Sequence, residues 1–344
     1  MYVIIMFSWS QQQPLIVLSP MAGYTDSAFK QIVRSVAKEA VVVTEFVSTD
    51  AVFYKSKKTL KMMAFDDVEH PVILQLFGKH PDRFVHAAKI AEQMGYDGVD
   101  INMGCPAKKV IHSDHGSALV KIENRCVAMQ IVRDMVNAVK IPISVKTRLG
   151  WENADELVGF CKELEANGCA SLAIHGRTTK QGYKGEANWN PIYEVKRNLS
   201  IPVFGNGDIT SVSAFRKKMY PALPGSCGVG NLNGVFVGRA SFGDPWILQD
   251  LITYAKNPQQ YEKLSDEELG KLFPRGADLS WEKKRAVALA HCEISVKVKG
   301  EQLGMLEMRK HLAAYVKGLP NASEMREKLV RVESLESAKQ LLRF

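Results

Sequence analysis

Eight short apolar or β-branched runs recur along the chain, and a glycine or a polar residue closes nearly all of them. The runs are 15–19, 41–45, 72–76, 98–102, 142–146, 171–175, 202–206 and 234–238. Nearly every interval between two runs carries apolar residues at helical spacing. This alternation constrains the fold more than any other feature of the sequence, because parallel strands joined by right-handed crossovers each need a connecting helix.

Local signals indicate where some of these helices begin and end. Asp26 stands at the position of a helix cap, ahead of a segment with one apolar face. Pro81 near the start and Gly95 at the end bracket a second helical segment. Later intervals repeat the pattern, with apolar stripes at Ala128, Ile131, Val132 and Met135 and at Leu157, Cys161 and Leu164.

Eight strands alternating with helices predict an α/β fold, a (β/α)8 TIM barrel in which the eighth strand pairs with the first. A doubly wound open sheet explains the alternation equally well, but it does not predict polar residues at the ends of successive strands. In a barrel those ends form one face, so their side chains would line a single pocket.

Strand signals stop near residue 264, and helical patterns rich in Glu, Lys, Arg and Leu continue to the end. We therefore expect a catalytic barrel domain at 1–260 and a small all-helical domain at 265–344. Lys and Arg outnumber Asp and Glu by 45 to 37, a formal net charge of +8, which favours approach to polyanions. The alternative is simply a soluble basic protein. The apolar segment 1–7 is too short to span a bilayer and resembles no signal peptide, so we expect a cytoplasmic protein without membrane contact.

Cys105 stands apart from the other cysteines. The six cysteines include no C-x-x-C pair, and no H-E-x-x-H motif accompanies them, so no metal site and no thioredoxin-type redox pair is predicted. Cys105 lies in Gly104-Cys105-Pro106-Ala107, on a loop just after the run 98–102. A thiol with an unperturbed pKa of about 8.5 is mostly protonated at neutral pH and can donate a proton. Alternatively, Cys105 is only a small residue before a proline turn.

Two glycine-bearing segments follow the seventh and eighth runs, where barrels commonly bind a phosphate. They are Asn206-Gly207-Asp208 and Gly238-Arg239. Glycine lets the backbone approach an anion closely, and arginine can bind two phosphate oxygens at once. Turn geometry alone would explain the glycines of either segment, but not both sites together. The sequence therefore predicts a phosphorylated cofactor.

Three further side chains suit the other end of such a cofactor. Lys146 and His175 close the fifth and sixth runs, and a cation and a hydrogen-bond donor there can stabilise a ring that becomes anionic on reduction. For each of them a structural salt bridge is the alternative. Gln75 offers a donor and an acceptor to the edge of a heterocycle. Flavin mononucleotide (FMN) meets all these requirements together.

At this point the chain resembles the tRNA-dihydrouridine synthases. The matching segments, in order, are Ser19-Pro20-Met21-Ala22-Gly23, Gln75-Leu76-Phe77-Gly78, Asp100-Ile101-Asn102-Met103-Gly104-Cys105-Pro106-Ala107, Val145-Lys146-Thr147-Arg148-Leu149-Gly150, His175-Gly176-Arg177-Thr178, Gly205-Asn206-Gly207-Asp208-Ile209 and Gly238-Arg239-Ala240-Ser241-Phe242-Gly243-Asp244-Pro245-Trp246. Each segment alone is weak, but the ordered set is specific and, with the helical tail, covers nearly the whole chain.

The resemblance implies a flavin-dependent oxidoreductase with a C-terminal tRNA-binding domain. Such an enzyme uses NADPH to reduce FMN and then reduces the C5–C6 double bond of a uridine in tRNA. The resemblance assigns FMN binding to Pro20, Met21, Ala22, Gln75, Lys146, His175, Asn206, Gly207, Asp208, Gly238 and Arg239. It makes Cys105 the proton donor to C5, while Asn102 and Arg177 would contact the substrate. A uracil inside tRNA must leave its stack to reach such a pocket, and the helical tail and positive charge suit a grip on the RNA.

Two segments depart from the family pattern. His112-Ser113-Asp114-His115-Gly116-Ser117 stands where relatives usually have a glycine-small-glycine run, and 220–233 is longer than expected. Two competing interpretations remain: an FMN-dependent reductase of a free pyrimidine or small enone, which would not need the helical tail, and a non-catalytic RNA-binding chaperone, which would not need the pocket residues. No stable protein partner is predicted.

Overall fold

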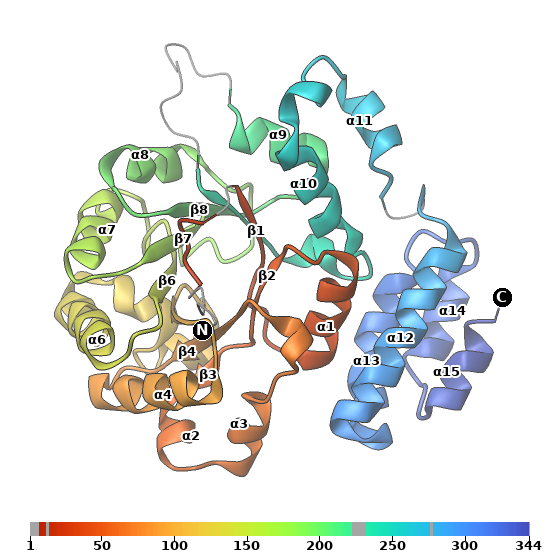
Figure 1. Ribbon diagram of the computed structural model, residues 1–344, viewed down its shortest axis with the longest axis horizontal. Coiled ribbons are helices and arrows are strands. Elements are labelled where there is room, and N and C mark those ends of the chain that lie inside the picture. The colour runs from red at the N-terminus through yellow and green to blue at the C-terminus, as the bar shows by residue number, and fades with distance from the viewer. Residues whose placement is uncertain (1–6, 12–13, 222–231, 276–277, 344) are drawn as a thin grey trace, which may run out of the picture.

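Eight parallel strands close into a barrel in the computed structural model, which describes residues 7–11, 14–221, 232–275 and 278–343 (Figure 1). The strands are β1 Leu15–Leu18, β2 Val41–Val43, β4 Val72–Phe77, β5 Gly98–Met103, β6 Ile143–Arg148, β7 Ser171–His175, β8 Val203–Asn206 and β9 Gly234–Val237. Pairing of β1 with β9 and of β2 with β4 completes the ring. The short β3, Val47–Ser48, pairs with β4 beyond the end of β2. The predicted TIM-type barrel is confirmed.

A ring of helices surrounds the strands. Its members are α1 Ser27–Val36, α4 Pro81–Met94, α6 Arg125–Ala138, α7 Leu157–Ala166, α8 Asn190–Asn198, α9 Val212–Met219 and α10 Trp246–Lys256. The carboxylate of Asp26 accepts a hydrogen bond from the Phe29 amide at 2.9 Å, so the predicted cap of α1 is present. Gly95 ends α4 in the left-handed conformation, with φ of 89°, which glycine adopts without strain.

The two ends of the barrel interior differ in character. At the end where the strands begin, Trp9 fills the interior beside Phe204 and Phe236, with ring centroids 5.3 and 6.2 Å away. At the other end, where the strands finish, the interior side chains are polar and buried, among them Gln75 and Asp100. The aromatic plug therefore leaves only the carboxyl end of the barrel as a polar mouth. The short helices α2 Thr49–Phe53, α3 Lys57–Met62 and α5 Lys108–Ile111 belong to the segments that follow strands at this mouth.

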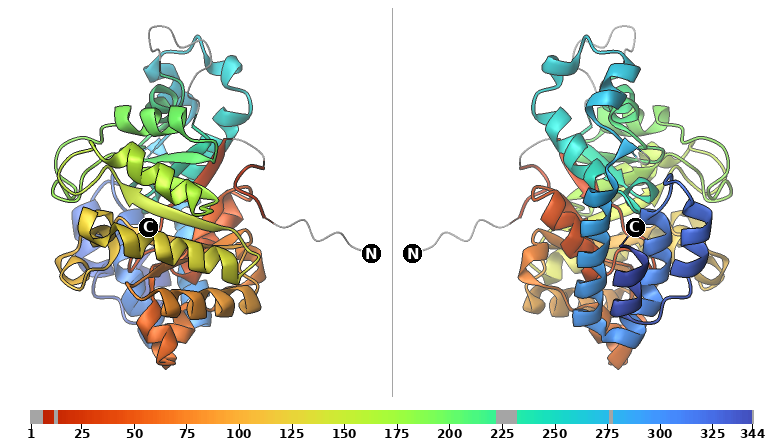
Figure 2. Two further views of the ribbon diagram at one scale, coloured as in Figure 1. Left: turned by 90° about the vertical axis from the view of Figure 1, so that its left-hand side faces the viewer. Right: turned by 90° about the vertical axis from the view of Figure 1, so that its right-hand side faces the viewer.

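The C-terminal helices form a body of their own that lies beside α1 (Figures 1 and 2). They are α12 Trp281–Lys299, α13 Glu301–Tyr315, α14 Ala322–Leu329 and α15 Leu335–Leu341. Their separate hydrophobic core includes Cys292, Met308 and Leu312. The preceding helix α11, Asp266–Leu272, instead buries Leu269 in the core of the barrel. We propose that the helical domain begins at α12, later than the residue 265 expected from the sequence.

Two sequence expectations concern loops. Most of the segment 220–233, including Gly228 and Gly230, lies outside the described residues. The segment 112–117 leads from α5 into the 3-10 helix Gly116–Val120, whose residues are buried, and Gly116 has a φ of 59°. Among the helices of the described ranges, none is long and apolar enough to cross a membrane.

Candidate active site

A chain of hydrogen bonds links three neighbouring strands at the barrel mouth. Gln75 on β4, Asp100 on β5 and Ser144 on β6 are register partners across the sheet. Asp100 Oδ2 accepts from Gln75 Nε2 at 2.7 Å, and its Oδ1 accepts from Ser144 Oγ at 2.8 Å. Gln75 Oε1 in turn accepts from Asn102 Nδ2 at 2.9 Å. All four side chains are buried, so the network lies inside the barrel rather than on its rim.

The direction of every bond in this chain is fixed by Asp100. An ionised carboxylate only accepts, so Gln75 must present its NH2 group to Asp100 and its carbonyl oxygen to Asn102. Asn102 must then turn its own oxygen outward, where it accepts from the backbone N–H groups of Gly104 and Cys105 at 3.1 and 2.9 Å. Burial raises the pKa of Asp100 to about 6, while Gln75 and Ser144 oppose the rise, so the carboxyl is still mainly ionised at neutral pH. This network of hydrogen bonds therefore orients the loop that carries Cys105.

Cys105 is half-buried at the mouth and keeps its proton. Burial raises the pKa of the thiol, although the Ala107 backbone N–H, Arg148 and Lys146 favour the thiolate. The loop is held on its other side by Ser117, whose hydroxyl donates to the Cys105 carbonyl oxygen at 2.8 Å. A thiol that is protonated at neutral pH and held by its backbone is suited to donate a proton rather than to act as a nucleophile.

Lys146 and His175 lie on the adjacent strands β6 and β7. Lys146 Nζ donates to Asn206 Oδ1 at 2.9 Å, and Asn206 donates to the Phe236 carbonyl oxygen at 2.7 Å. Burial, followed by the charge of Arg148, lowers the pKa of Lys146 to about 8. Burial and then the surrounding cations, Lys146 first, lower the pKa of His175 to about 2, so its ring is neutral. His175 Nδ1 is buried and has no hydrogen-bond partner among the described residues.

The sequence predicts a phosphate site on the segments after β8 and β9. Gly207 and Asp208 have φ of 118° and 54°, and within the described residues their backbone N–H groups donate to no protein acceptor. Arg239, after β9, is 61% exposed, and its guanidinium lies 5.3 Å from the centre of the Tyr183 ring. The turn after β1, which holds Pro20, Met21 and Ala22, comes alongside, because a Cβ on Gly238 would lie 3.4 Å from Met21 Sδ.

Arg177 and Asp208, two residues predicted to contact ligands, bind one another in the structure. The Arg177 guanidinium donates to both carboxylate oxygens of Asp208, at 2.9 and 2.8 Å, and to the carbonyl oxygens of Lys184 and Gly185. Asp208 also accepts from the Ala187 amide at 2.8 Å. Arg177 is only 3% exposed, so its charge is used to hold the loop 177–185 against β8.

The sequence interpretation missed Arg148 and Asp100. Arg148 Nε donates to the Gly104 carbonyl oxygen at 2.7 Å, and its Nη1 donates to the carbonyl oxygens of Thr178 and Gly182 at 3.1 and 2.8 Å. It thereby connects the Cys105 loop with the loop 177–185. The available signal was the two-residue period of a strand, since Arg148 shares a face with Lys146 and Asp100 shares one with Asn102.

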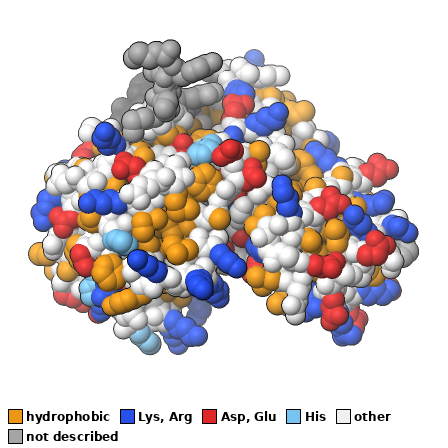
Figure 3. Space-filling model, turned by 60° about the horizontal axis from the view of Figure 1, so that its bottom comes forward, with side chains coloured by type: hydrophobic (Ala, Val, Ile, Leu, Met, Phe, Trp, Pro, Cys, Tyr) orange, Lys and Arg blue, Asp and Glu red, His pale blue; other side chains and the backbone are white. Residues whose placement is uncertain are grey.

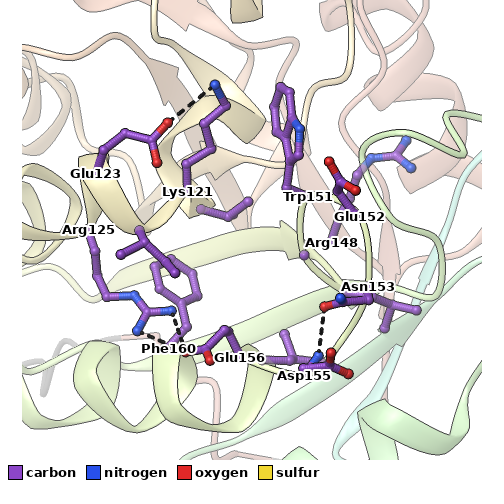
Figure 4. Close-up of a pocket in the computed structure, with 15 residues that line it drawn as sticks. Lys121, Glu123, Arg125, Arg148, Trp151, Glu152, Asn153, Asp155, Glu156 and Phe160 are labelled. Atoms are coloured by element: carbon purple, nitrogen blue, oxygen red, sulfur yellow. Dashed lines mark hydrogen bonds and ion pairs between the residues drawn. The ribbon is translucent and has the colours of Figure 1, made fainter.

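A cavity of about 490 Å³ lies between the segment 120–125 and the start of α7, and Arg148 is among its lining residues (Figure 4). Its charges have both signs: Lys121 pairs with Glu123 at 3.5 Å, and Arg125 pairs with Glu156 at 3.4 Å. Lys121 also covers the ring of Trp151 at 4.4 Å. Because its charges are largely paired with one another, this cavity does not have the unpaired donors of a phosphate site.

The residues at the barrel mouth, in contrast, fit FMN. The unpartnered Nδ1 of His175 and the backbone N–H groups after β8 are donors or acceptors that await a ligand. Lys146, Arg148, Arg177 and Arg239 surround His175 with positive charge. The site therefore offers anion-binding groups where a phosphate belongs and a positive field where a reduced ring would carry negative charge.

Comparison with known proteins gives one consistent result. The sequence model of the family described as dihydrouridine synthase (Dus) matches residues 17–344. The chain is 35% identical over 329 residues to the probable tRNA-dihydrouridine synthase 1 of Synechocystis sp. The aligned residues cover 95% of this chain and 85% of that protein. It is 32% identical over 323 residues to tRNA-dihydrouridine synthase B of Pseudomonas aeruginosa, covering 94% and 90% of the two chains.

A solved structure supports the fold alone. A complex of 2-naphthoyl-CoA reductase superimposes with a TM-score of 0.53 at 11% sequence identity, covering 69% of this chain and 50% of that chain.

Proposed function

The chain belongs to the dihydrouridine synthase family, and from this premise we propose how its own residues reduce uridines of tRNA to 5,6-dihydrouridine. As a member of the family it is a flavin-dependent oxidoreductase with FMN as cofactor and NADPH as reductant. The observation that carries the proposed mechanism is the position of Cys105, whose backbone N–H is held at the barrel mouth by Asn102 and whose thiol has a pKa raised by burial.

Eleven residues of the mouth would hold FMN. The phosphate would bind the backbone N–H groups of Gly207 and Asp208 together with Gly238 and Arg239, where the chain offers free donors and an exposed cation. Gln75 would face the edge of the ring, and Lys146, His175 and Asn206 would lie beside the ring atoms that gain charge. The turn Pro20-Met21-Ala22 would cover one side.

Cys105 is the proposed acid of the reaction. When bound, FMN supplies the hydride that adds to C6 of the uracil. Cys105 Sγ donates its proton to C5, so that one hydride and one proton saturate the double bond and leave a thiolate to be reprotonated from solvent. Lys146 and Arg148 favour that thiolate, so they lower the cost of the transfer without removing the proton beforehand.

Asn102 and Arg177 have positioning roles in this proposal. Asn102 holds the Cys105 loop through two backbone N–H groups, and from there it would contact the substrate. Arg177 is occupied by Asp208, so it would act on the substrate through the loop 177–185 that it holds. Loss of either side chain would displace a loop rather than remove a proton donor.

We propose that the helical domain grips the tRNA while the target uridine turns out of its stack into the mouth. A cytoplasmic location, where tRNA is found, is part of the same proposal. The excess of eight positive charges favours this contact and makes it sensitive to salt.

The test compares the wild type with Cys105→Ala. Purified wild type should carry FMN and convert uridine to dihydrouridine in unmodified tRNA with NADPH, as measured by mass spectrometry of digested tRNA. Cys105→Ala should keep its flavin absorbance but lose about 10²- to 10⁴-fold in single-turnover rate, the usual contribution of a general acid. Wild type that binds FMN but leaves tRNA unmodified while reducing a free pyrimidine would contradict the proposal.

A further inference from the structure

The segment from α2 to α3 carries four lysines that pair with nothing in the described structure. Lys55, Lys57, Lys58 and Lys61 are all exposed. The side-chain amino group of each forms neither a hydrogen bond nor an ion pair with another described residue, whereas the neighbouring Arg83 pairs with Asp50 at 2.7 Å. Four unpaired like charges within seven positions repel one another, so a surface of this kind is stabilised by an anionic partner.

The same segment exposes large apolar side chains. Phe53 is 41% exposed, Tyr54 68%, Leu60 38% and Met62 40%. These are four of the 13 large apolar residues that the described structure exposes, and they fall within ten positions. The Arg83 guanidinium lies 5.5 and 5.3 Å from the ring centres of Phe53 and Tyr54. We call the four lysines, Phe53, Tyr54, Leu60 and Met62 the α2–α3 surface.

The α2–α3 surface belongs to the same end of the barrel as the active site. α2 begins directly after β3, which extends the β2 side of the sheet towards the mouth. The β4–α4 connection touches the segment that follows Cys105, since Phe77 packs against His115 at 5.8 Å and Lys79 pairs with Asp114 at 3.5 Å. α2 packs on α4, so the surface is continuous with the loops around the pocket.

The α2–α3 surface lies apart from the helical domain. The helical domain lies beside α1, whereas α2 and α3 project from a different part of the barrel (Figure 1). In Figure 3, which turns that part forward, hydrophobic and basic side chains lie side by side on the barrel, and a furrow separates them from the helical domain.

We propose that the α2–α3 surface is a second docking surface for the tRNA whose uridine enters the active site. This inference rests on the proposed function. The lysines would contact successive phosphates, and Tyr54 and Phe53 would stack on bases that tertiary structure leaves exposed. Charge complementarity and the shared face with the pocket favour RNA over a lipid surface or a protein. Contact on two sides of the mouth would hold the RNA while one base is drawn out.

The experiment replaces Lys55, Lys57, Lys58 and Lys61 by Gln in the full chain. A matched control replaces Lys38, Lys140, Lys162 and Lys263 by Gln, since these are also exposed and form no ion pair with described residues. Both variants lose the same charge. The first should raise the Kd for unmodified tRNA at least tenfold. It should also reduce the slope of log Kd against log salt by about 3, because each of the four lost phosphate contacts contributes roughly 0.7–0.9 to that slope. Tyr54→Ala should weaken binding with the slope unchanged.

Each outcome decides the proposal. The first variant should keep its FMN content and its NADPH oxidation without tRNA, which shows that the pocket is intact. Equal Kd values and salt slopes for the two variants would overturn the second surface, even if wild type makes dihydrouridine. Loss of binding to anionic phospholipid vesicles with tRNA affinity unchanged would overturn it in favour of a lipid partner. If wild type itself made no dihydrouridine in tRNA, the proposed function would fail instead.

Discussion

Lys146 at the barrel mouth and Lys299 at the end of α12 are both largely buried, but their surroundings shift their pKa values in opposite directions. Lys146 contacts the neutral amide of Asn206, and burial lowers its pKa to about 8. Burial would lower the pKa of Lys299 as well, but Asp26 and Glu307 outweigh it and raise that pKa. Lys299 Nζ donates to both carboxylates. Among the described residues Lys146 therefore forms no ion pair, although the charge of Asp100 partly opposes the fall in its pKa, whereas Lys299 pairs with two carboxylates.

This difference separates a binding site from a structural contact. Asp26 caps α1 and also binds Lys299 of α12, so one carboxylate joins the barrel to the helical domain. Phe29 of α1 packs against both His291 and His311, with ring centroids 5.5 and 5.3 Å away. At the mouth, by contrast, Lys146 and Arg148 form no ion pair with any described carboxylate, so positive charge is left for an anionic ligand. A buried lysine that pairs with carboxylates, such as Lys299, stabilises the fold, whereas a buried lysine without an ion pair, such as Lys146, is suited to bind an anionic ligand.

The largest effect should follow from breaking the matched pair. In Lys299→Met, the Asp26 carboxylate stays buried without its cation, which typically costs about 3 kcal/mol or more. The measurement is the free energy of unfolding from urea titration. Lys328→Ala provides the control, because Lys328 forms an exposed pair with Glu324 on α14 and such pairs contribute about 0–1 kcal/mol. Equal losses in the two variants would show that the Asp26–Lys299 contact does not fasten the domain.

The reverse pattern is expected at the mouth. Lys146→Met removes a buried cation that forms no ion pair with any described residue, so the apoprotein should be as stable as wild type or more stable. FMN affinity and tRNA reduction should fall, the rate by about 100-fold, which corresponds to about 2.7 kcal/mol. Flavin titration and single-turnover assays measure these effects, and urea unfolding of the apoprotein measures stability. A strongly destabilised apoprotein with normal FMN affinity would make Lys146 a structural residue and remove the contrast with Lys299.

The same contrast explains what the sequence could predict. Lys146, His175 and Gln75 each end an apolar run, so the period of the strands and the closure of the barrel place them together without any knowledge of contacts. The pairing of Asp26 with Lys299 spans 273 positions between two helical segments, and no local pattern indicates it. Asp26 was predicted only as a helix cap, which it is.

The sequence also could not predict which side chains bind one another at the mouth. Arg177 and Asp208 both follow strands, and their mutual bonds depend on how two loops fold over the mouth. The lysines of the α2–α3 surface became distinct only when the structure showed them gathered without ion pairs beside exposed apolar side chains. Local periodicity thus predicts which residues reach the mouth, whereas the choice of partner depends on tertiary packing.

The smallest effect concerns pH at the domain contact. His291 is fully buried, and burial lowers its pKa to about 4, below the value of about 6.5 for an unfolded chain. The unfolded state therefore binds more protons, so this contribution to stability is complete above pH 6.5 and is lost as pH falls towards 4. Burial would raise the pKa of Asp26, but Lys299 and the histidines hold it at about 2, so its contribution is lost only below about pH 3.9.

His291 also faces His311 and Lys310 on α13 and Lys299 on its own helix, and Lys299 in turn binds Glu307; all of these are present in every variant compared. His291→Gln keeps a polar group near the Tyr315 hydroxyl, which lies 3.3 Å from His291 Nδ1, but cannot titrate. Unfolding free energies measured from pH 7 to pH 4 should therefore fall less steeply in His291→Gln than in wild type. Parallel curves would mean that His291 does not sense protons at this contact, and would leave the buried His311, whose pKa burial also lowers, as the group that titrates there.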